Sequence, residues 1–326
     1  MKIAVFDLQP HEKRMFNKLE PQYKIHYFKE SADDVNLQAL KDCDVISVFV
    51  LSKLSAEVLK QFPKLKMVAA RSTGFDNIDL KYCAKHKIIV CNVPAYGEVT
   101  VAEHTFALLL AVSRKIQIAC WQGLKKKFDP QPLKGFDLHS KTIGVIGAGK
   151  IGKNVIKIAH GFGLEILAYD INRDKLLAEI LDFKYTDLKI LLKKSDIVTL
   201  HTPYNKSTHH LINQKTIKMF KRGAILINTA RGGLIDTNIL LTALQNGTLV
   251  AAGLDVLEEE NVIIKNQKTT AKNKEISLKN KKLIALPQVV FTPHIAFNTQ
   301  EAVERITETS IENIISFHNG QAINKV

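Results

Sequence analysis

The chain has few cysteines and no long apolar run. Its four cysteines (Cys43, Cys83, Cys91 and Cys120) show no CxxC spacing and no nearby histidine cluster. This argues against zinc sites and disulfides, so we expect reduced thiols, no metal and a cytoplasmic protein. The most apolar stretch, Phe106–Val112, is far shorter than the roughly 20 residues that span a bilayer. The first ten residues, MKIAVFDLQP, contain an acid at position 7, too early for the apolar core of a secretory signal.

The chain is nevertheless basic, with a formal net charge of +14 over 326 residues. Its lysines are scattered, and no long basic run alternates with aromatic residues, so we expect no nucleic-acid partner. A basic surface would instead attract an anionic cofactor and a carboxylate substrate. The densest group, residues 265–282, has seven lysines against the single acid Glu275. We interpret residues 261–282 as a polar surface insertion, mobile or partly helical.

Strand-like and helix-like segments alternate along the chain, which is typical of parallel sheets covered by helices. We therefore predict an α/β protein with two doubly wound parallel-sheet domains, the second with the six strands of a full Rossmann sheet. Strands are expected in the first domain at Ile3–Phe6, Val45–Val50, Met67–Ala70 and Ile88–Val90. In the second they are expected at Ile143–Ile146, Glu165–Tyr169, Ile197–Leu200, Ala224–Asn228, Val250–Leu254 and Val289–Thr292.

Two long helical patterns flank this second series of strands. Residues 99–119 form one apolar helical pattern without proline or glycine, so we expect a helix buried on most sides. Residues 299–319 form another pattern, too short to be a domain, so we expect the chain to return to the first domain. This predicts a Rossmann domain at residues 99–295, inserted into a smaller flavodoxin-like domain of residues 1–98 and 296–326.

The stretch TIGVIGAGKIG (142–152) has the pattern of a dinucleotide-binding turn. Gly147 permits a tight turn, Gly149 lets backbone N–H groups approach a pyrophosphate, and Gly152 lets the next helix lie close to the strand. The following apolar run ends at Asp170, 18 residues after Gly152, where a carboxylate accepts hydrogen bonds from the adenosine ribose. We predict NAD as the cofactor, whereas Arg173 leaves NADPH as an alternative. A glycine-rich turn selected only for packing is the other interpretation.

Chemically active side chains follow three of the later strands, at the edge where such sheets bind ligands. Arg231 offers a fork of donors that matches a carboxylate, and His294 is the best acid/base candidate because imidazole titrates near neutrality. A paired carboxylate would fix the tautomer of His294, and the spacing alone does not choose among Glu258, Glu259 and Glu260. The alternative is a surface arginine that caps a helix and three solvated glutamates.

Four further histidines have less specific contexts. His104 lies in the apolar helical pattern, and we interpret it as structural. His201 follows a strand at the cofactor edge, where it either touches nicotinamide or only packs. His209 and His210 follow a loop and are interpreted as structural or solvated.

The chain resembles the D-isomer-specific 2-hydroxyacid dehydrogenases over essentially its whole length. The motifs that carry the resemblance are STGFDNID (72–79), NVPAYGEVTVAEHTFALLLA (92–111), GVIGAGKIG (144–152), HTP (201–203), INTARGGLIDTNILLTAL (227–244), GLDV (253–256) and TPHIAF (292–297). The resemblance implies NAD as cofactor, a small 2-keto or 2-hydroxy acid as substrate, and a homodimer formed through the helix at 99–119.

The resemblance also implies a role for each site residue. Arg231 would bind the substrate carboxylate and carbonyl, and His294 would be the acid/base, paired with Glu260 rather than with its neighbours. The implied cofactor contacts are Gly147, Gly149, Lys150, Ile151, Gly152, Asp170, Thr202, Pro203, Thr208, Thr229, Ala230 and Asp255. The implied substrate contacts are Thr73, Gly74, Tyr96, Arg231 and Phe297.

Three details are similar to the D-lactate dehydrogenase branch of this family: Ile295-Ala296-Phe297 after His294, the 34 residues from Glu260 to His294, and Tyr96. The activity implied is NADH-dependent reduction of a 2-keto acid to the D-2-hydroxy acid, foremost pyruvate to D-lactate. One alternative is a 2-hydroxyisocaproate-type dehydrogenase for larger 2-keto acids. The other is a non-enzymatic NADH-sensing protein, like the corepressors that share the fold.

Overall fold

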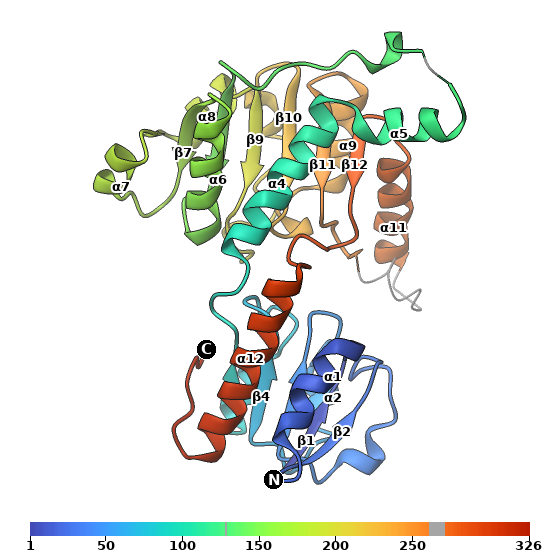
Figure 1. Cartoon of the computed structure of the whole chain (residues 1–326), viewed down its shortest axis with the longest axis vertical. Helices are drawn as coiled ribbons and strands as arrows, with labels where there is room; N and C mark the ends of the chain where they lie inside the picture. The colour runs from blue at the N-terminus through green and yellow to red at the C-terminus, as the bar shows by residue number, and fades with distance from the viewer. Residues whose placement is uncertain (128, 261–270) are drawn as a thin grey trace. The chain divides into compact units, whose positions relative to one another are not determined.

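The computed structural model describes residues 1–127, 129–260 and 271–326, and the chain divides into two compact units (Figure 1). Unit 1 consists of Met1–Tyr96 and Asn298–Val326, and unit 2 consists of Gly97–Phe297. Each unit is built on one sheet whose strands are all parallel. The predicted α/β class with two doubly wound sheets is confirmed.

Unit 1 has five strands in the order β2-β1-β3-β4-β5, which is the flavodoxin-like order. The strands are β1 (Lys2–Val5), β2 (Lys24–Tyr27), β3 (Val45–Val48), β4 (Met67–Ala70) and β5 (Ile89–Cys91). The helices are α1 (Pro10–Phe16), α2 (Ala56–Leu59), α3 (Leu80–Lys85) and α12 (Gln300–His318). The edge strand β2 is an element that the apolar runs did not predict.

The C-terminal segment completes unit 1. Helix α12 packs against α1 and β4. Its buried Asn313 donates from Nδ2 to the carbonyl of Asn92 at 2.9 Å. The amide of Asn92 donates to the carbonyl of Asn324 at 3.0 Å, and that of Val326 to Val90 at 3.0 Å. These bonds hold the last residues of the chain beside β5.

Unit 2 has seven strands in the order β12-β11-β10-β9-β6-β7-β8. The chain runs outward from β6 through β7 to β8 and then returns to β9, so the ends of β6 and β9 form the switch point where doubly wound sheets bind ligands. The strands are β6 (Thr142–Ile146), β7 (Glu165–Tyr169), β8 (Lys184–Tyr185), β9 (Ile197–Leu200), β10 (Ala224–Asn228), β11 (Leu249–Leu254) and β12 (Val289–Phe291). Six were predicted, and the two-residue β8 is additional.

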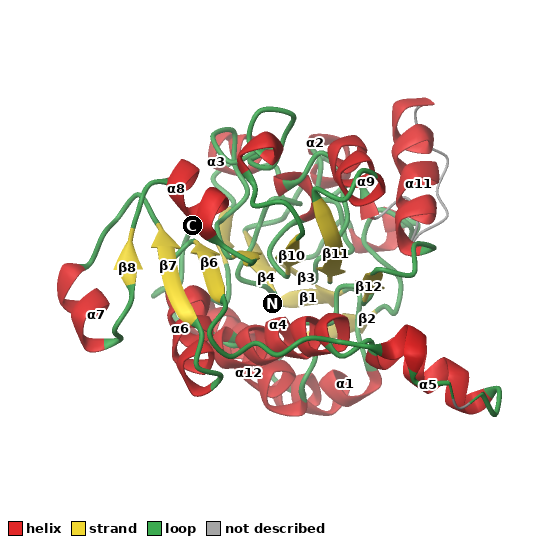
Figure 2. Cartoon of the chain, turned by 90° about the horizontal axis from the view of Figure 1, so that it is seen from above, coloured by secondary structure: helices red, strands yellow, loops and turns green. Residues whose placement is uncertain are grey.

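Helices cover both faces of this sheet (Figure 2). On one face lie α4 (Glu98–Ser113) and α6 (Lys150–Gly161), and on the other lie α8 (Leu188–Lys194), α9 (Thr237–Gln245) and α11 (Ala271–Ile284). Helix α7 (Lys175–Ile180) lies between β7 and β8 in the chain. Helix α11 confirms that the polar stretch 261–282 is partly helical, whereas residues 261–270 are outside the described residues.

The single helix predicted at 99–119 is wrong. The structure has two helices there, α4 and α5 (Ile116–Leu124), separated at Lys115, whose φ of 50° and ψ of 37° are left-handed. The carbonyl of Ser113 accepts the amide of Phe136 at 3.1 Å, and this contact takes the place of the next helical hydrogen bond. Helix α4 is largely buried, but no residue of α5 is buried, so burial on most sides holds only for the first helix.

Two negative observations apply to residues 1–127, 129–260 and 271–326. No helix there has the length and apolarity needed to cross a membrane. No group of three or more histidine, cysteine, aspartate or glutamate side chains is placed to hold a metal ion.

Candidate active site

The chemically active side chains of unit 2 follow the carboxyl ends of β10, β11 and β12. Arg231 comes three residues after β10, Glu260 six residues after β11 and His294 three residues after β12. Because these three strands are adjacent and parallel, the loops that carry the side chains leave the same edge of the sheet.

His294 and Glu260 form a direct pair. Nδ1 of His294 lies 2.5 Å from Oε1 of Glu260, and the two side chains are 19% and 20% exposed. The second carboxylate oxygen, Oε2, accepts the amide of Leu257 at 3.0 Å. With Nδ1 held by a carboxylate, Nε2 is the ring nitrogen that can exchange a proton with a ligand.

The other two glutamates have different surroundings, so the structure resolves the choice that spacing left open. Glu258 pairs with Nε2 of His210 at 2.8 Å, so the structural interpretation holds for His210 rather than the solvated one. The side chain of Glu259 is exposed, and its backbone has a φ of 52°.

The buried carboxylate of Asp255 organises the loop that carries His294. It accepts the amides of Ile295 and Ala296, both at 2.9 Å, and the hydroxyl of Thr292 at 2.6 Å. The carbonyl of Asp255 accepts the amide of His294 at 2.8 Å. His294 itself has a φ of 55°, a left-handed conformation that requires such support.

His104 of α4 completes this arrangement. Its Nε2 lies 2.9 Å from Oγ1 of Thr292 and 3.4 Å from Oδ1 of Asp255. Burial raises the pKa of Asp255, but the hydrogen bonds from His104, Thr292 and the loop amides outweigh burial, and the pKa lies below its usual value. His104 therefore has the structural role predicted for it. It contacts Thr292 and Asp255, which hold the loop of the proposed acid/base, His294. No local pattern indicates this pairing, because 188 residues separate His104 from Thr292.

Arg231 lies in residues 229–233, the arginine loop. This loop touches residues 257–260, the glutamate turn. Its carbonyl accepts Nδ2 of the buried Asn228 at 2.9 Å, and its own Nη1 donates to the carbonyl of Ala230 at 2.8 Å. A Cβ on the next residue, Gly232, would lie 2.0 Å from the carbonyl carbon and oxygen of Leu257. Only glycine allows the two backbones to approach so closely. Asn228 ends an apolar strand pattern, and nothing in that pattern indicates that its side chain fixes this loop.

The glycine-rich turn satisfies the geometry that a dinucleotide requires. Gly147 has a φ of 97°, and a Cβ there would lie 2.6 Å from the backbone of His201. A Cβ on Gly152 would lie 1.9 Å from the carbonyl oxygen of Gly147. At Gly149, in contrast, a Cβ would meet no atom within 4 Å. Packing therefore accounts for the first and third glycines, whereas the second leaves open space before α6, where a phosphate group fits.

Asp170 lies beside this turn. Its Oδ2 accepts the amide of Ala148 at 2.7 Å, and its Oδ1 accepts the amide of Asn172 at 2.9 Å. Arg173 donates to Asp187 at 2.9 Å. A carboxylate at this position favours a free ribose hydroxyl over a 2′-phosphate.

Two buried polar atoms at the end of β9 have no protein partner among the described residues, namely Nδ1 of His201 and Oγ1 of Thr202. Nε2 of His201 lies 2.8 Å from Oγ1 of Thr199. Burial lowers the pKa of His201 to about 3, so the ring is neutral near pH 7. Unpartnered polar atoms at the switch point are what a bound cofactor would satisfy.

The remaining cofactor candidates lie on the same edge of unit 2 and are held by local contacts. Thr208 donates from Oγ1 to the carbonyl of Pro203 at 2.7 Å and so shapes its own loop. Oγ1 of the buried Thr229 lies 3.0 Å from Oγ1 of Thr105 in α4. The amide of Ala230 donates to Asn228 at 3.0 Å. Lys150 and Ile151 begin helix α6.

The substrate candidates are divided between the units. Phe297 belongs to unit 2, and its ring meets that of His294 edge-on, with centroids 6.4 Å apart. Thr73, Gly74 and Tyr96 belong to unit 1. There, Oγ1 of Thr73 donates to the carbonyl of Val93 at 2.7 Å, and the carbonyl of Tyr96 accepts Nε of Arg305 at 2.7 Å.

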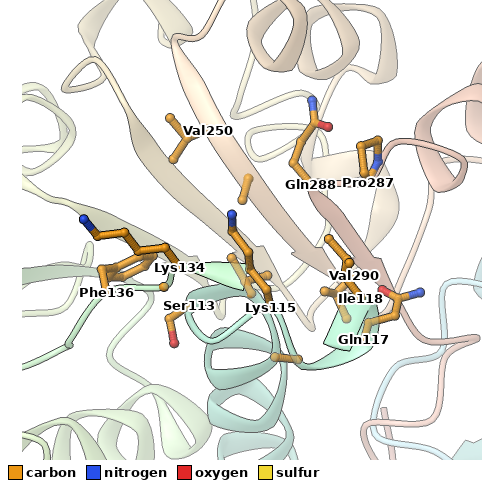
Figure 3. A pocket seen from close by; sticks show the side chains of 14 residues that line it. Ser113, Lys115, Gln117, Ile118, Lys134, Phe136, Val250, Pro287, Gln288 and Val290 are labelled. Atoms are coloured by element: carbon orange, nitrogen blue, oxygen red, sulfur yellow. The ribbon is translucent and has the colours of Figure 1, made fainter. Parts of the chain in front are cut away.

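Unit 2 also has a cavity of about 390 Å³ at the opposite, amino edge of its sheet (Figure 3). It lies between the end of α4, the start of α5 and the first residues of β11 and β12. Ile118, Phe136, Val250 and Val290 form much of its apolar lining, and Lys115 is at its border. None of the site residues described above lines this cavity.

A glycine-rich turn at the switch point, with unpartnered polar atoms next to it and ionisable side chains at the neighbouring strand ends, is the geometry of a dinucleotide-dependent oxidoreductase. Comparison with known proteins narrows this class. Residues 106–296 match the family described as "D-isomer specific 2-hydroxyacid dehydrogenase, NAD binding domain". The chain belongs to the D-isomer-specific 2-hydroxyacid dehydrogenases, as the sequence motifs predicted, and its cofactor is NAD.

Relatives match over nearly the whole length. "2-Hydroxyacid dehydrogenase homolog 1" of Schizosaccharomyces pombe is 37% identical, covering 97% of this chain and 96% of its own. The glyoxylate reductase of Thermococcus litoralis is 36% identical, covering 98% and 95%. The structure of D-lactate dehydrogenase from Aquifex aeolicus, complexed with NAD and lactic acid, has a TM-score of 0.89 at 36% identity, covering 98% and 96%. The activity is therefore NAD-dependent reduction of 2-keto acids to D-2-hydroxy acids.

Proposed function

We propose that this protein reduces pyruvate to D-lactate with NADH. The observation that carries the choice of substrate is the edge-on contact of Phe297 with His294, because an aromatic wall beside the acid/base favours a small, apolar side chain on the substrate. The similarity to the lactate-bound Aquifex aeolicus enzyme supports the same choice.

In this proposal Arg231 binds the carboxylate of the 2-keto acid through its planar fork and polarises the keto oxygen. NADH, held by the glycine-rich turn and Asp170, would supply the hydride for this reduction. Nε2 of His294 protonates the oxygen that becomes the hydroxyl, while Glu260 on Nδ1 stabilises the imidazolium form. In the direction of lactate oxidation, the neutral imidazole takes up the same proton. Thr73, Gly74 and Tyr96 of unit 1 remain proposed substrate contacts.

A panel of 2-keto acids tests the substrate. NADH oxidation is measured with pyruvate, phenylpyruvate, 2-ketoisocaproate, glyoxylate and hydroxypyruvate, and we expect the highest kcat/KM for pyruvate. A higher value for 2-ketoisocaproate would assign the enzyme to larger 2-keto acids, and a higher value for glyoxylate would make it a glyoxylate reductase. Tight NADH binding without turnover of any acid would instead indicate an NADH sensor. Each of these three results contradicts the proposal.

Substitution of the proposed acid/base tests the mechanism. We expect His294→Ala to lower kcat by roughly 10²–10⁴-fold, the usual contribution of a general acid. Glu260→Gln should lower kcat as well, because a neutral amide replaces the carboxylate that holds Nδ1 of His294. His11→Ala, at an exposed position of α1, is the matched control and should keep the wild-type kcat. Wild-type turnover in His294→Ala would remove this histidine from the mechanism.

A homodimer formed through the surface of α4 and α5 is also part of the proposal. Helix α5 exposes Ile116 (46%), Trp121 (54%) and Leu124 (86%), and the cavity at the amino edge of the sheet lies beside it. Apolar side chains next to an apolar hollow suit a two-fold interface, in which each copy supplies both parts.

A cytoplasmic location is proposed as well, because three of the four free cysteines are buried and none forms a disulfide.

A further inference from the structure

Beside the His294–Glu260 pair, unit 2 contains a second histidine–glutamate pair. Nε2 of His210 lies 2.8 Å from Oε1 of Glu258, and the side chains are 28% and 14% exposed. Oε2 of Glu258 accepts the hydroxyl of Thr237 at 2.9 Å. The carbonyl of Glu258 accepts Nδ2 of the buried Asn280 at 2.7 Å. Glu258 is thus held through both carboxylate oxygens and its backbone.

His210 is fixed as firmly on its own side. Its amide donates to the carbonyl of Gly233 at 2.9 Å, two residues after Arg231. Its ring stacks on that of His209 with centroids 3.9 Å apart, and Nδ1 of His209 lies 3.0 Å from the hydroxyl of Tyr204. His210 therefore connects the arginine loop, through its backbone, to the glutamate turn, through its side chain.

The peptide between Leu257 and Glu258 is where these connections meet the proposed catalytic groups. A Cβ on Gly232 would lie 2.0 Å from the carbonyl of Leu257 and 2.4 Å from the amide nitrogen of Glu258, so this peptide lies directly against the arginine loop. The amide of Leu257 also donates to Oε2 of Glu260 at 3.0 Å. A displacement of this peptide would move Arg231 and Glu260 together.

The backbone around these pairs is strained at three points. His210, Glu259 and His294 have φ values of 48°, 52° and 55°, in the left-handed region that side chains other than glycine rarely adopt. Such conformations persist only where surrounding contacts hold them, and they cluster at functional sites. Glu259 lies between the two paired glutamates, so the two pairs hold the strained turn from both ends.

We propose that His210 and Glu258 are positioning residues for the reduction of the 2-keto acid. Their pair holds the peptide between Leu257 and Glu258 against Gly232. This contact keeps Glu260 paired with His294, and it orients Arg231 toward the substrate. Neither residue touches the reacting atoms in this assignment. The inference rests on the proposed roles of Arg231, Glu260 and His294.

The test is Glu258→Gln in the full-length protein, with whichever acid of the panel gives the highest kcat/KM. We expect kcat to fall by roughly 10²-fold, as small displacements of catalytic groups do, with the NADH dissociation constant unchanged. The KM for the 2-keto acid should rise as well, because Arg231 is displaced together with Glu260. Loss of stability alone would leave this KM unchanged, because the molecules that remain folded bind the acid normally. Glu179→Gln makes the same chemical change at an exposed position of α7, outside this turn, and should keep the wild-type kcat and KM.

A double-variant cycle checks that the pair acts as a unit. His210→Gln with Glu258→Gln should lose no more activity than either single variant, because each alone already breaks the pair. If Glu258→Gln does not fold, as judged by circular dichroism and NADH binding, His210→Gln decides in the same assays. Wild-type kcat and KM in the folded variant, with His294→Ala inactive, would overturn the positioning role alone. Unchanged kcat in His294→Ala would overturn the proposed function itself.

Discussion

At the scale of single residues, His201 is a half-buried base that the fold keeps neutral. Burial lowers its pKa to about 3, against about 6.5 in an unfolded chain. Above pH 6.5 the ring is neutral in both states, so it adds no pH dependence. Between pH 6.5 and 3 only the unfolded chain binds the extra proton, so the free energy of unfolding falls as pH decreases, by about 1.4 kcal/mol per pH unit.

Urea unfolding measures this effect. Between about pH 7 and about pH 5, the wild type should lose roughly 2 kcal/mol more unfolding free energy than His201→Asn, which has no ring to protonate. His11→Asn, at an exposed position of α1, should lose as much as the wild type. Equal losses in the wild type and His201→Asn would show that His201 is protonated in the folded protein.

The same scale shows how far the sequence could predict the site. Arg231, a glutamate and His294 follow adjacent strands, and that alone placed them at one edge. Spacing could not choose Glu260, because the left-handed Glu259 reorients the turn and sends its two neighbours to different histidines. The role of Asp255 beneath the His294 loop depends on contacts with His104 that no local pattern encodes.

At the scale of elements, the turn from β6 into α6 separates the packing role of glycine from its ligand role. Gly152→Ala would place a Cβ 1.9 Å from the carbonyl oxygen of Gly147, so we expect a loss of about 1–3 kcal/mol in unfolding free energy. Gly149→Ala meets no protein atom within 4 Å, so the fold should be unaffected while a bound pyrophosphate is crowded. We expect its NADH dissociation constant to rise by roughly 10-fold or more, about 1.4 kcal/mol.

Gly161→Ala is the control on the same helix, because a Cβ there also meets nothing within 4 Å and the position is remote from the turn. It should leave NADH binding unchanged. Urea unfolding and fluorescence titration with NADH give both quantities for the three variants. Wild-type NADH affinity in Gly149→Ala would show that the open space at this glycine is not where the cofactor binds.

Elements with continuous apolar runs could be predicted, and short or bent ones could not. The fully buried strands β9 and β10 were found because both faces are apolar. Strand β2, KIHY, lies at an edge with no fully buried residue, and β8 has only two residues, so neither has a clear pattern. The break between α4 and α5 contains no proline or glycine. It follows from the contact of Phe136 with the carbonyl of Ser113, which comes from a segment distant in the chain.

At the scale of the whole molecule, unit 2 holds both the cofactor turn and the groups proposed for the chemistry. Gly147, Asp170, Arg231, Glu260 and His294 all lie within Gly97–Phe297. Unit 1 comes from both ends of the chain, Met1–Tyr96 and Asn298–Val326, and contains Thr73, Gly74 and Tyr96. The amino edge of the unit 2 sheet, where α5 and the cavity lie, is separate from these groups. A homodimer interface at this edge would therefore not overlap with them.

That separation allows the proposed homodimer to be tested without touching the chemistry. Trp121 is 54% exposed on α5, with Nζ of Lys125 over its ring at 3.6 Å. Burying a charge in an apolar interface is unfavourable, so Trp121→Glu should dissociate the dimer. Sedimentation velocity should give twice the monomer mass for the wild type and the monomer mass for the variant. Ile180→Glu, at a 68% exposed position of α7, introduces the same charge elsewhere and should leave the dimer intact. A monomeric wild type, or dissociation by both variants alike, would contradict an interface at α5.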